Sequence, residues 1–249
     1  MLVLVFLIIG IASFVFSMLG QGGALVYVPL LSWAGFDMVT VAIPLALLLN
    51  GLTTGFVLIP FARKKLVDWK GGAIMAATAL IAAALGAITS PYVPVRTLKL
   101  LFAVMVIIAA MRIFWVSGKA EPEAMLSLHK RSTIGFFVGG FAGFSGGLLG
   151  VGGGFIIAPI LMMMGYKTKE AAATTAFVVT FSSFSGYLGH VTQSHMNWLL
   201  TVIGVAAVII GSQLGGRFVV KKAKSRQVKI TYAVVLFLIA SKLIYSVIV

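Results

Sequence analysis

Two glycine clusters in this chain could each present backbone amide groups to a ligand. The first, Gly20-Gln21-Gly22-Gly23, is followed by a short apolar stretch that reaches Pro29. The second cluster lies 130 positions later and contains Gly150, Gly152, Gly153 and Gly154. A glycine-rich break before a helix start leaves several N–H groups without an intrahelical acceptor, and the helix dipole adds a partial positive charge there. Such a site can bind an anion without any charged side chain.

Polar side chains at a matching place in each half could complete such a site. In the first half these are Asn50, Thr53 and Thr54, whose spacing puts them on one helix face. The equivalent stretch of the second half contains Thr180 and Ser183. Hydroxyl and amide groups donate to anion oxygens without adding charge. Hydrogen bonding between helices is the alternative role for each of them.

Two glutamines and two histidines are the other polar candidates. Gln21 and Gln213 stand in apolar surroundings, and we expect both to line the same pathway. We expect His190 and His195 to lie in an outer loop, where solvation is the usual state and proton coupling is the alternative role. No further ligands cluster near them, so we predict no metal site.

The composition predicts the elements that must position these residues. Of the 249 residues, 61% are hydrophobic and only 10% are charged, whereas soluble domains carry about 25% charged residues. Uncharged apolar runs of this length mark membrane spans. Continuous apolar blocks argue against a β-barrel, whose segments are shorter and alternate. We therefore predict an all-α polytopic membrane protein.

The apolar segments indicate an internal duplication. They lie at about 2–19, 24–34, 39–61, 71–91 and 97–116, then at 133–149, 154–164, 170–189, 199–218 and 228–248. The same 130-residue shift that relates the glycine clusters also pairs Gly86 with Gly216. We expect a first membrane repeat at 1–116, a cytoplasmic linker at 117–132 and a second membrane repeat at 133–249.

The loop charges predict how the repeats are oriented. Suppose that the two apolar segments around each glycine cluster enter and leave the membrane on the same side. Then Arg96, Lys99 and Lys242 lie on one side of the membrane, and the other 16 of the 19 Lys and Arg residues lie on the opposite side. Such a bias marks the cytoplasmic side. Each repeat is then a glycine-broken helical hairpin plus three transmembrane helices, the two repeats are inverted, and both termini lie outside. The short second piece favours a re-entrant hairpin over two full crossings.

None of the five acidic residues lies inside a predicted span. Three of them are at segment ends and two are in the linker. The three are Asp37, Asp68 and Glu170, and the linker contains Glu121 and Glu123. Intramembrane carboxylates usually mark proton relays or cation sites. A cation carrier with a dedicated acidic site is therefore disfavoured. Since the chain also contains no cysteine, neither disulfides nor thiolate chemistry is expected.

The doubled motif Gly-x-Gly-Gly-(Gly/Ala) followed by Pro resembles the TauE/SafE sulfite exporter family, also called the toluene sulfonate uptake permeases. The matching residues are Gly20, Gly22, Gly23 and Pro29, then Gly150, Gly152, Gly153, Gly154 and Pro159. The resemblance covers nearly the whole chain. It implies a bacterial or archaeal carrier of sulfite, sulfonates or related sulfur-containing anions, driven by an ion gradient. Ala24 and Gln21 depart from the family pattern, which leaves the substrate open and also whether the halves contribute equally.

These observations predict a non-enzymatic transporter of a small sulfur-containing anion that works by alternating access in a bacterial or archaeal inner membrane. The anion is sulfite, a sulfonate, thiosulfate or a similar organosulfur anion, and a proton or another ion is the expected coupling partner. No cofactor is expected, and no nucleic acid, because the basic residues lie in short loops between spans. An anion channel of the same fold is the alternative. A membrane-embedded enzyme is disfavoured because a catalytic motif is missing.

Overall fold

The computed structural model describes residues 2–117, 124–195, 197–221 and 237. All regular structure within these residues is helical, as predicted. The α-helices are α1 Leu2–Ser17, α2 Ala24–Trp33, α3 Ile43–Arg63, α4 Trp69–Thr89, α5 Val95–Ser117, α6 Leu128–Leu149, α7 Gly154–Met163, α8 Thr168–His190 and α9 Trp198–Lys221. A π-helical turn, η1 Met38–Ala42, leads into α3, and short 3₁₀ turns follow α4 and α8.

Helix length distinguishes the helices that can span a membrane from the short helices that follow the glycine breaks. Five helices are long and apolar enough to cross a membrane: α3 with its leading turn, α4, α6, α8 and α9. The helices after the breaks, α2 and α7, have 10 residues each, which is about 15 Å, or half of the hydrocarbon thickness. The predicted segments match these helices, and the one at 228–248 lies outside the described residues apart from position 237.

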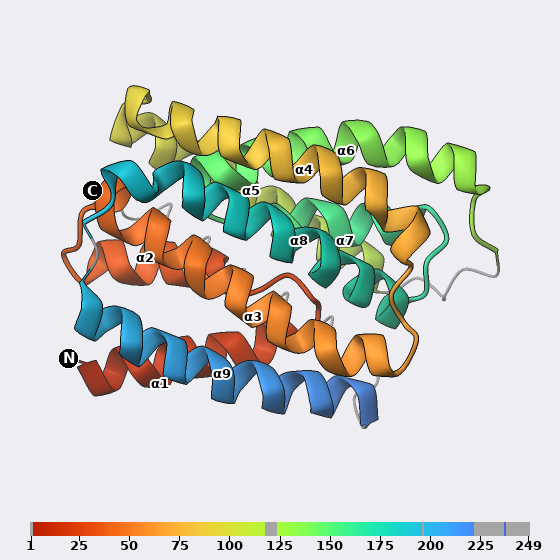
Figure 1. Ribbon diagram of the computed structural model, residues 1–249, viewed down its shortest axis with the longest axis horizontal. Coiled ribbons are helices and arrows are strands. Elements are labelled where there is room, and N and C mark those ends of the chain that lie inside the picture. The colour runs from red at the N-terminus through yellow and green to blue at the C-terminus, as the bar shows by residue number, and fades with distance from the viewer. Residues whose placement is uncertain (1, 118–123, 196, 222–236, 238–249) are drawn as a thin grey trace.

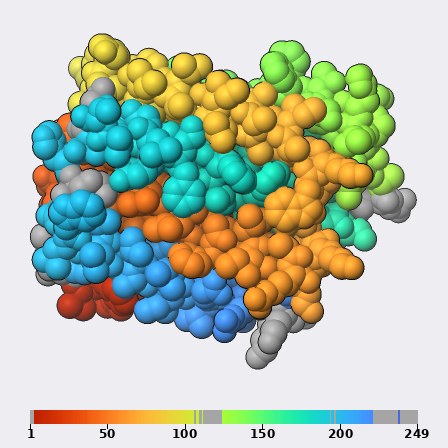
Figure 2. All heavy atoms as spheres, viewed as in Figure 1, coloured from red at the N-terminus to blue at the C-terminus, as the bar shows by residue number. Residues whose placement is uncertain are grey.

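Helices α3 and α8 form the centre of the molecule and run in opposite directions. The amide of His195, just beyond the end of α8, donates to the Thr40 carbonyl before the start of α3. At the other end, the amide of Asp68, which follows α3, donates to Thr174 near the start of α8. Figure 1 shows this central pair between α4 and α6 on one side and α1 and α9 on the other. In the space-filling view the face made by α4, α8, α3 and α9 is closely packed (Figure 2).

Glycine stripes bring the outer helix pairs into close contact. A Cβ placed on Gly143 of α6 would lie 2.4 Å from the Ala79 carbonyl oxygen of α4, and one on Gly147 would lie 2.0 Å from that of Ala83. On the other side, a Cβ on Gly215 of α9 would lie 2.2 Å from the Phe14 carbonyl oxygen of α1. Small residues allow membrane helices to approach this closely.

The described carboxylates lie at helix starts, as predicted. Asp37 accepts hydrogen bonds from the amides of Val39 and Thr40, and Glu170 accepts one from the Lys167 amide. A negative charge at a helix N-terminus satisfies free amides and opposes the positive end of the helix dipole. Glu121 and Glu123 lie outside the described residues.

Helix α6 begins five residues earlier than the predicted segment, at Leu128 rather than 133. Its first turn is polar and was assigned to the linker, because hydropathy reports only the apolar part of a helix. The structure instead anchors this turn through Arg131, which forms a salt bridge with Asp68 ahead of α4. A helix can extend past its apolar segment where tertiary contacts hold its polar end.

Asp68, Arg131 and Tyr166 form one hydrogen-bonded cluster that joins α4, α6 and the α7–α8 loop. The Arg131 guanidinium donates to the Tyr166 hydroxyl at 2.9 Å, and this hydroxyl donates to the Asp68 carboxylate at 2.8 Å. Burial alone would raise the pKa of Asp68. Hydrogen bonds from the Gly71 amide and the Tyr166 hydroxyl, together with the guanidinium charge, instead hold that pKa below its ordinary value of 3.8. The carboxylate is therefore charged at neutral pH.

We predict that Asp68→Asn lowers the free energy of unfolding at neutral pH by about 1–2 kcal/mol, because it leaves Arg131 without its ionic partner. Since folding lowers the pKa of Asp68, the stabilisation is present above 3.8 and is lost as the pH falls through the folded-state pKa. Equilibrium unfolding in mild detergent measures this difference. Lys70→Gln, which removes an exposed charge beside the cluster, is the control. Equal stability of Asp68→Asn and the unchanged protein at pH 7 would contradict the assignment.

Candidate functional site

The chain leaves the helical path at both glycine clusters. Between α1 and α2, Gly20 and Gly22 have φ angles of +66° and +69°. Between α6 and α7, the φ angles of Gly150, Gly152 and Gly153 are +79°, +68° and +80°. Other L-residues in this left-handed region cost about 1–2 kcal/mol each. The backbone conformation of the two breaks therefore requires glycine.

The two breaks meet at the side chain of Asn50. A Cβ on Gly22 would lie 2.1 Å from Asn50 Oδ1, and a Cβ on Gly152 would lie 2.6 Å from Asn50 Nδ2. Gly154 lies directly against the first break, since its Cβ would be 2.9 Å from Gln21 Cα. Segments that are 130 positions apart in the sequence thus come into contact in the interior.

Asn50 connects the halves of the molecule through two hydrogen bonds. Its Oδ1 accepts from the amide of Ala24, the first residue of α2, at 2.9 Å. Its Nδ2 donates to Ser183 Oγ of α8, also at 2.9 Å. The side chains of Asn50 and Ser183 are completely buried. A buried polar group without a partner costs about 1–3 kcal/mol, so this pairing holds both elements at the break.

Backbone amides at both breaks remain without a hydrogen-bond acceptor among the described residues. They belong to Gly22, Gly23, Leu25, Gly153, Gly154 and Phe155. Each set stands at a helix N-terminus, where the dipole contributes a partial positive charge. No described residue that is buried in the interior carries a charged side chain. The electrostatics of this region therefore favour a negatively charged ligand.

Hydroxyl groups of α3 take part in two further sets of contacts. Thr54 of α3 and Thr180 of α8 have their hydroxyl oxygens 3.0 Å apart. Thr53 belongs to a different group, with its hydroxyl 3.2 Å from that of Tyr27. The Tyr27 hydroxyl also lies 2.6 Å from Ser13 Oγ, which shows that α2 folds back alongside α1. The predicted threonines are thus divided between the α3–α8 contact and the first hairpin.

The remaining predicted residues occupy different places. Gln21 is buried at the first break, in contact with Gly154. Gly20 lies against the Ala172 carbonyl of α8, and Gly150 lies against Ile43 of α3. The structure does not bring Gln213 to the breaks. Its side-chain amide donates to the Phe56 carbonyl, because α9 packs against the second half of α3.

Sequence reasoning missed Ser13 and Tyr27, and it did not place Ser182 in the site. Ser182 donates to the Gly152 carbonyl at 2.8 Å and so fixes the second break. Tyr27 carries a polar side chain inside the first glycine motif, and this was the available signal. Ser13 gives no comparable signal, because its role depends on α2 folding back to bring Tyr27 beside it.

The prediction that His190 lies solvated in a loop is wrong. His190 is the last residue of α8 and only 1% of its surface is exposed. Its Nε2 lies 3.1 Å from the carbonyl oxygen of Gly147 in α6. The helix continues further than the apolar pattern, and its last turn packs against α6. Within the described residues, no three His, Asp or Glu side chains lie close enough together to hold a metal ion.

Comparisons with known proteins relate the whole chain to membrane transporters. The family described as "Sulfite exporter TauE/SafE" matches residues 5–243. The probable membrane transporter protein YunE of Bacillus subtilis is 28% identical, with 95% of this chain and 94% of the relative covered. The probable membrane transporter protein MJ0441 of Methanocaldococcus jannaschii is 24% identical, with 86% and 84% covered. Sulfite exporter TauE/SafE family protein 3 of Arabidopsis thaliana is 29% identical, with 42% and 21% covered. No solved structure matches significantly.

We predict that Asn50→Ala and Ser183→Ala are coupled in a double-mutant cycle by about 0.5–1.5 kcal/mol, because each removes one partner of the same buried hydrogen bond. Equilibrium unfolding of the four proteins in detergent measures the coupling. Ser145→Ala is the matched control in place of Ser183→Ala, since Ser145 bonds only to carbonyls of its own helix. Additive effects of Asn50→Ala and Ser183→Ala would show that this bond does not join the halves.

Proposed function

Because this chain belongs to the sulfite exporter TauE/SafE family of membrane transporters, we propose that it moves a small sulfur-containing anion across the bilayer by alternating access. Sulfite, thiosulfate and sulfonates are the candidate substrates. The observation that carries the proposal is the meeting of two glycine breaks, with their free amides, at one buried asparagine. The name of the Arabidopsis relative supports the substrate class.

The anion oxygens accept hydrogen bonds from the free amides of the two breaks. Amides of Gly22, Gly23 and Leu25 approach from one half, and those of Gly153, Gly154 and Phe155 from the other. Non-helical backbone at membrane depth is tolerated where it lines a ligand cavity. In the structure Asn50 Oδ1 accepts from the Ala24 amide, so a neutral oxygen occupies a position that an anion oxygen would take.

Alternating access requires two parts that move relative to each other around this site. The helices α1, α3 and α9 pack together, and so do α4, α6 and α8. Close backbone contacts at glycines make the α1–α9 and α4–α6 pairs rigid. Between the two groups lie the polar contacts Asn50–Ser183 and Thr54–Thr180. We place the movement at this α3–α8 interface, where side-chain packing is accompanied by exchangeable hydrogen bonds.

The duplicated architecture supplies the two related half-sites. We propose inverted repeats at 1–116 and 133–249, joined by a cytoplasmic linker at 117–132, with both termini outside the cell membrane. The opposite directions of α3 and α8 support this arrangement. So does the exchange of partners, since α1 packs on α9 of the second repeat and α6 packs on α4 of the first. A proton or another ion is the proposed coupling partner.

We predict that Gly22→Ala reduces anion transport in proteoliposomes by about tenfold or more, while membrane insertion is retained. The left-handed backbone alone adds about 1–2 kcal/mol of strain, and the new Cβ would lie 2.1 Å from Asn50 Oδ1. Gly140→Ala is the control, because a Cβ there meets no atom within 4 Å. Undiminished transport by Gly22→Ala would refute the site.

We predict that sulfite, thiosulfate or a sulfonate raises the melting temperature of the purified protein, whereas the cations of the same salts do not. A ligand that binds only the folded state at 100 times its dissociation constant stabilises by about 2.7 kcal/mol. Flux that saturates with anion concentration, and uphill movement driven by an ion gradient, distinguish a carrier from a channel. An unchanged melting temperature with all three anions would count against the substrate class.

A further inference from the structure

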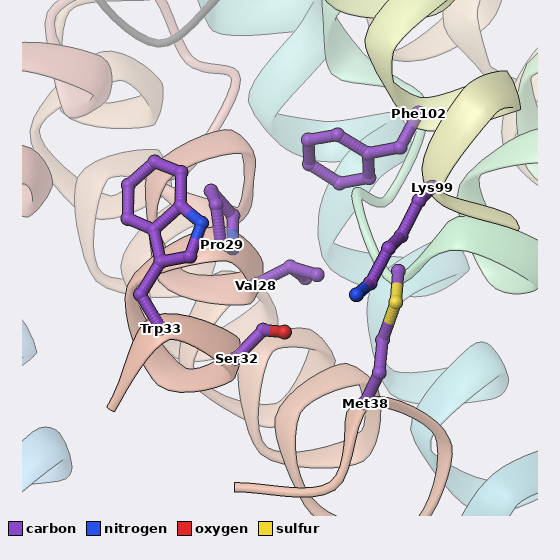
Figure 3. A pocket seen from close by; sticks show the side chains of 7 residues that line it. All are labelled: Val28, Pro29, Ser32, Trp33, Met38, Lys99 and Phe102. Carbon is purple, nitrogen blue, oxygen red and sulfur yellow. The ribbon is translucent and has the colours of Figure 1, made fainter. Parts of the chain in front are cut away.

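A cavity lined by a charged side chain lies at the far end of α2. It has a volume of about 120 Å³ and lies between the second half of α2, the start of η1 and α5 (Figure 3). An apolar cavity of about 150 Å³ can admit a molecule the size of benzene, so this space is large enough for a small anion. The residues that matter for its chemistry are Val28, Ser32, Met38, Lys99 and Phe102.

Lys99 gives this cavity a positive charge. Its ammonium group points into the space toward Val28 and Met38, and the Ser32 hydroxyl points into the same space (Figure 3). No carboxylate lines the cavity. Among the described residues the salt bridge of Arg131 with Asp68 is the only one, so no ionic partner neutralises Lys99 there. An ammonium group and a hydroxyl can both donate to a sulfur oxyanion.

Helix α2 connects this cavity with the glycine break. The break stands at the N-terminus of α2, where Gly23 is the capping residue. Val28 and Ser32 follow on the same helix, about 8–14 Å further along its axis. An anion held at Lys99 is therefore one to three helical turns from the free amides of the first break.

The corresponding helix of the second half, α7, borders a groove with a different lining. The 130-residue shift relates Pro29 to Pro159 and Ser32 to Met162. A groove of about 350 Å³ lies beside Pro159, and it is lined only by hydrophobic side chains of α5, α6 and α7. The charged lining of the Lys99 cavity therefore differs from the apolar lining of the groove beside α7.

We propose that the Lys99 cavity is a capture site, in which the transported sulfur-containing anion binds before it reaches the glycine breaks from that side. This inference rests on the proposed function. A positive charge at the mouth of a pathway raises the local anion concentration and the association rate by factors of about 10 to 1,000. The alternative is that Lys99 only stabilises the C-terminal end of α2 through the helix dipole.

The test is the concentration dependence of sulfite or thiosulfate flux in oriented proteoliposomes. We expect Lys99→Gln to raise the half-saturating anion concentration by about tenfold when the anion is added on the Lys99 side. The value from the opposite side and the maximal rate stay unchanged. Lys99→Arg keeps the charge and restores the half-saturating concentration. The effect shrinks at about 1 M salt, where the screening length is about 3 Å.

Arg96→Gln is the matched control, since Arg96 is an exposed cation one turn earlier on α5 that does not line the cavity. Unchanged flux of Lys99→Gln from both sides, or an equal change in Arg96→Gln, would overturn the capture site. A lowered melting temperature with an unchanged half-saturating concentration would also overturn it, in favour of the helix-dipole role.

If Gly22→Ala abolishes transport in the same experiment and Lys99→Gln changes nothing, the capture site is refuted and the proposed function is not. If the unsubstituted protein moves none of these anions, the proposed function fails first.

Discussion

A backbone amide inside a membrane must find an acceptor, and this requirement governs the whole molecule. A helix satisfies its amides internally, which is why every spanning element among the described residues is helical. At the two glycine breaks the backbone is not helical, so some amides lose their intrahelical acceptor. The Asn50 carboxamide accepts from one of these amides, that of Ala24, and it also donates to Ser183. The amides that have no acceptor among the described residues lie at these two breaks, which contact each other. A ligand that accepts many hydrogen bonds, such as the oxyanion that we propose, would satisfy them.

Glycine meets two separate physical needs in this fold. At Gly22 and Gly152 it permits a left-handed backbone and leaves room for the Asn50 side chain. At Gly143 and Gly215 it lets two helices touch through their backbones. The first use shapes the region that we propose as the anion site, and the second brings the outer helix pairs into backbone contact beside it. In the proposed mechanism this site opens toward one side by movement at the α3–α8 contact.

The sequence was a good guide to the elements and a weaker one to the site. Segment limits agreed closely with the helices, because a long apolar run in a membrane has few alternatives to a helix. The start of α6 and the burial of His190 differed, since both depend on contacts with another helix. The sequence predicts both Asn50 and Ser183 as site residues, but nothing in their spacing indicates that they bond to each other. It also predicts Gln213 from its polarity, whereas this side chain bonds to α3 away from the breaks.

The helical class and the positions of both breaks could be predicted from the sequence, and the sequence also predicts which sign of ligand charge the breaks favour. These predictions follow from local properties, namely apolar length, glycine conformation and the scarcity of acidic residues. The contact between the breaks, the shared role of one asparagine and the position of Ser13 beside Tyr27 came from the folded structure alone. Asn50 and Ser183 are 133 positions apart, and no local preference acts over such a distance. Their contact depends on how α3 and α8 pack, which is a property of the assembled helices.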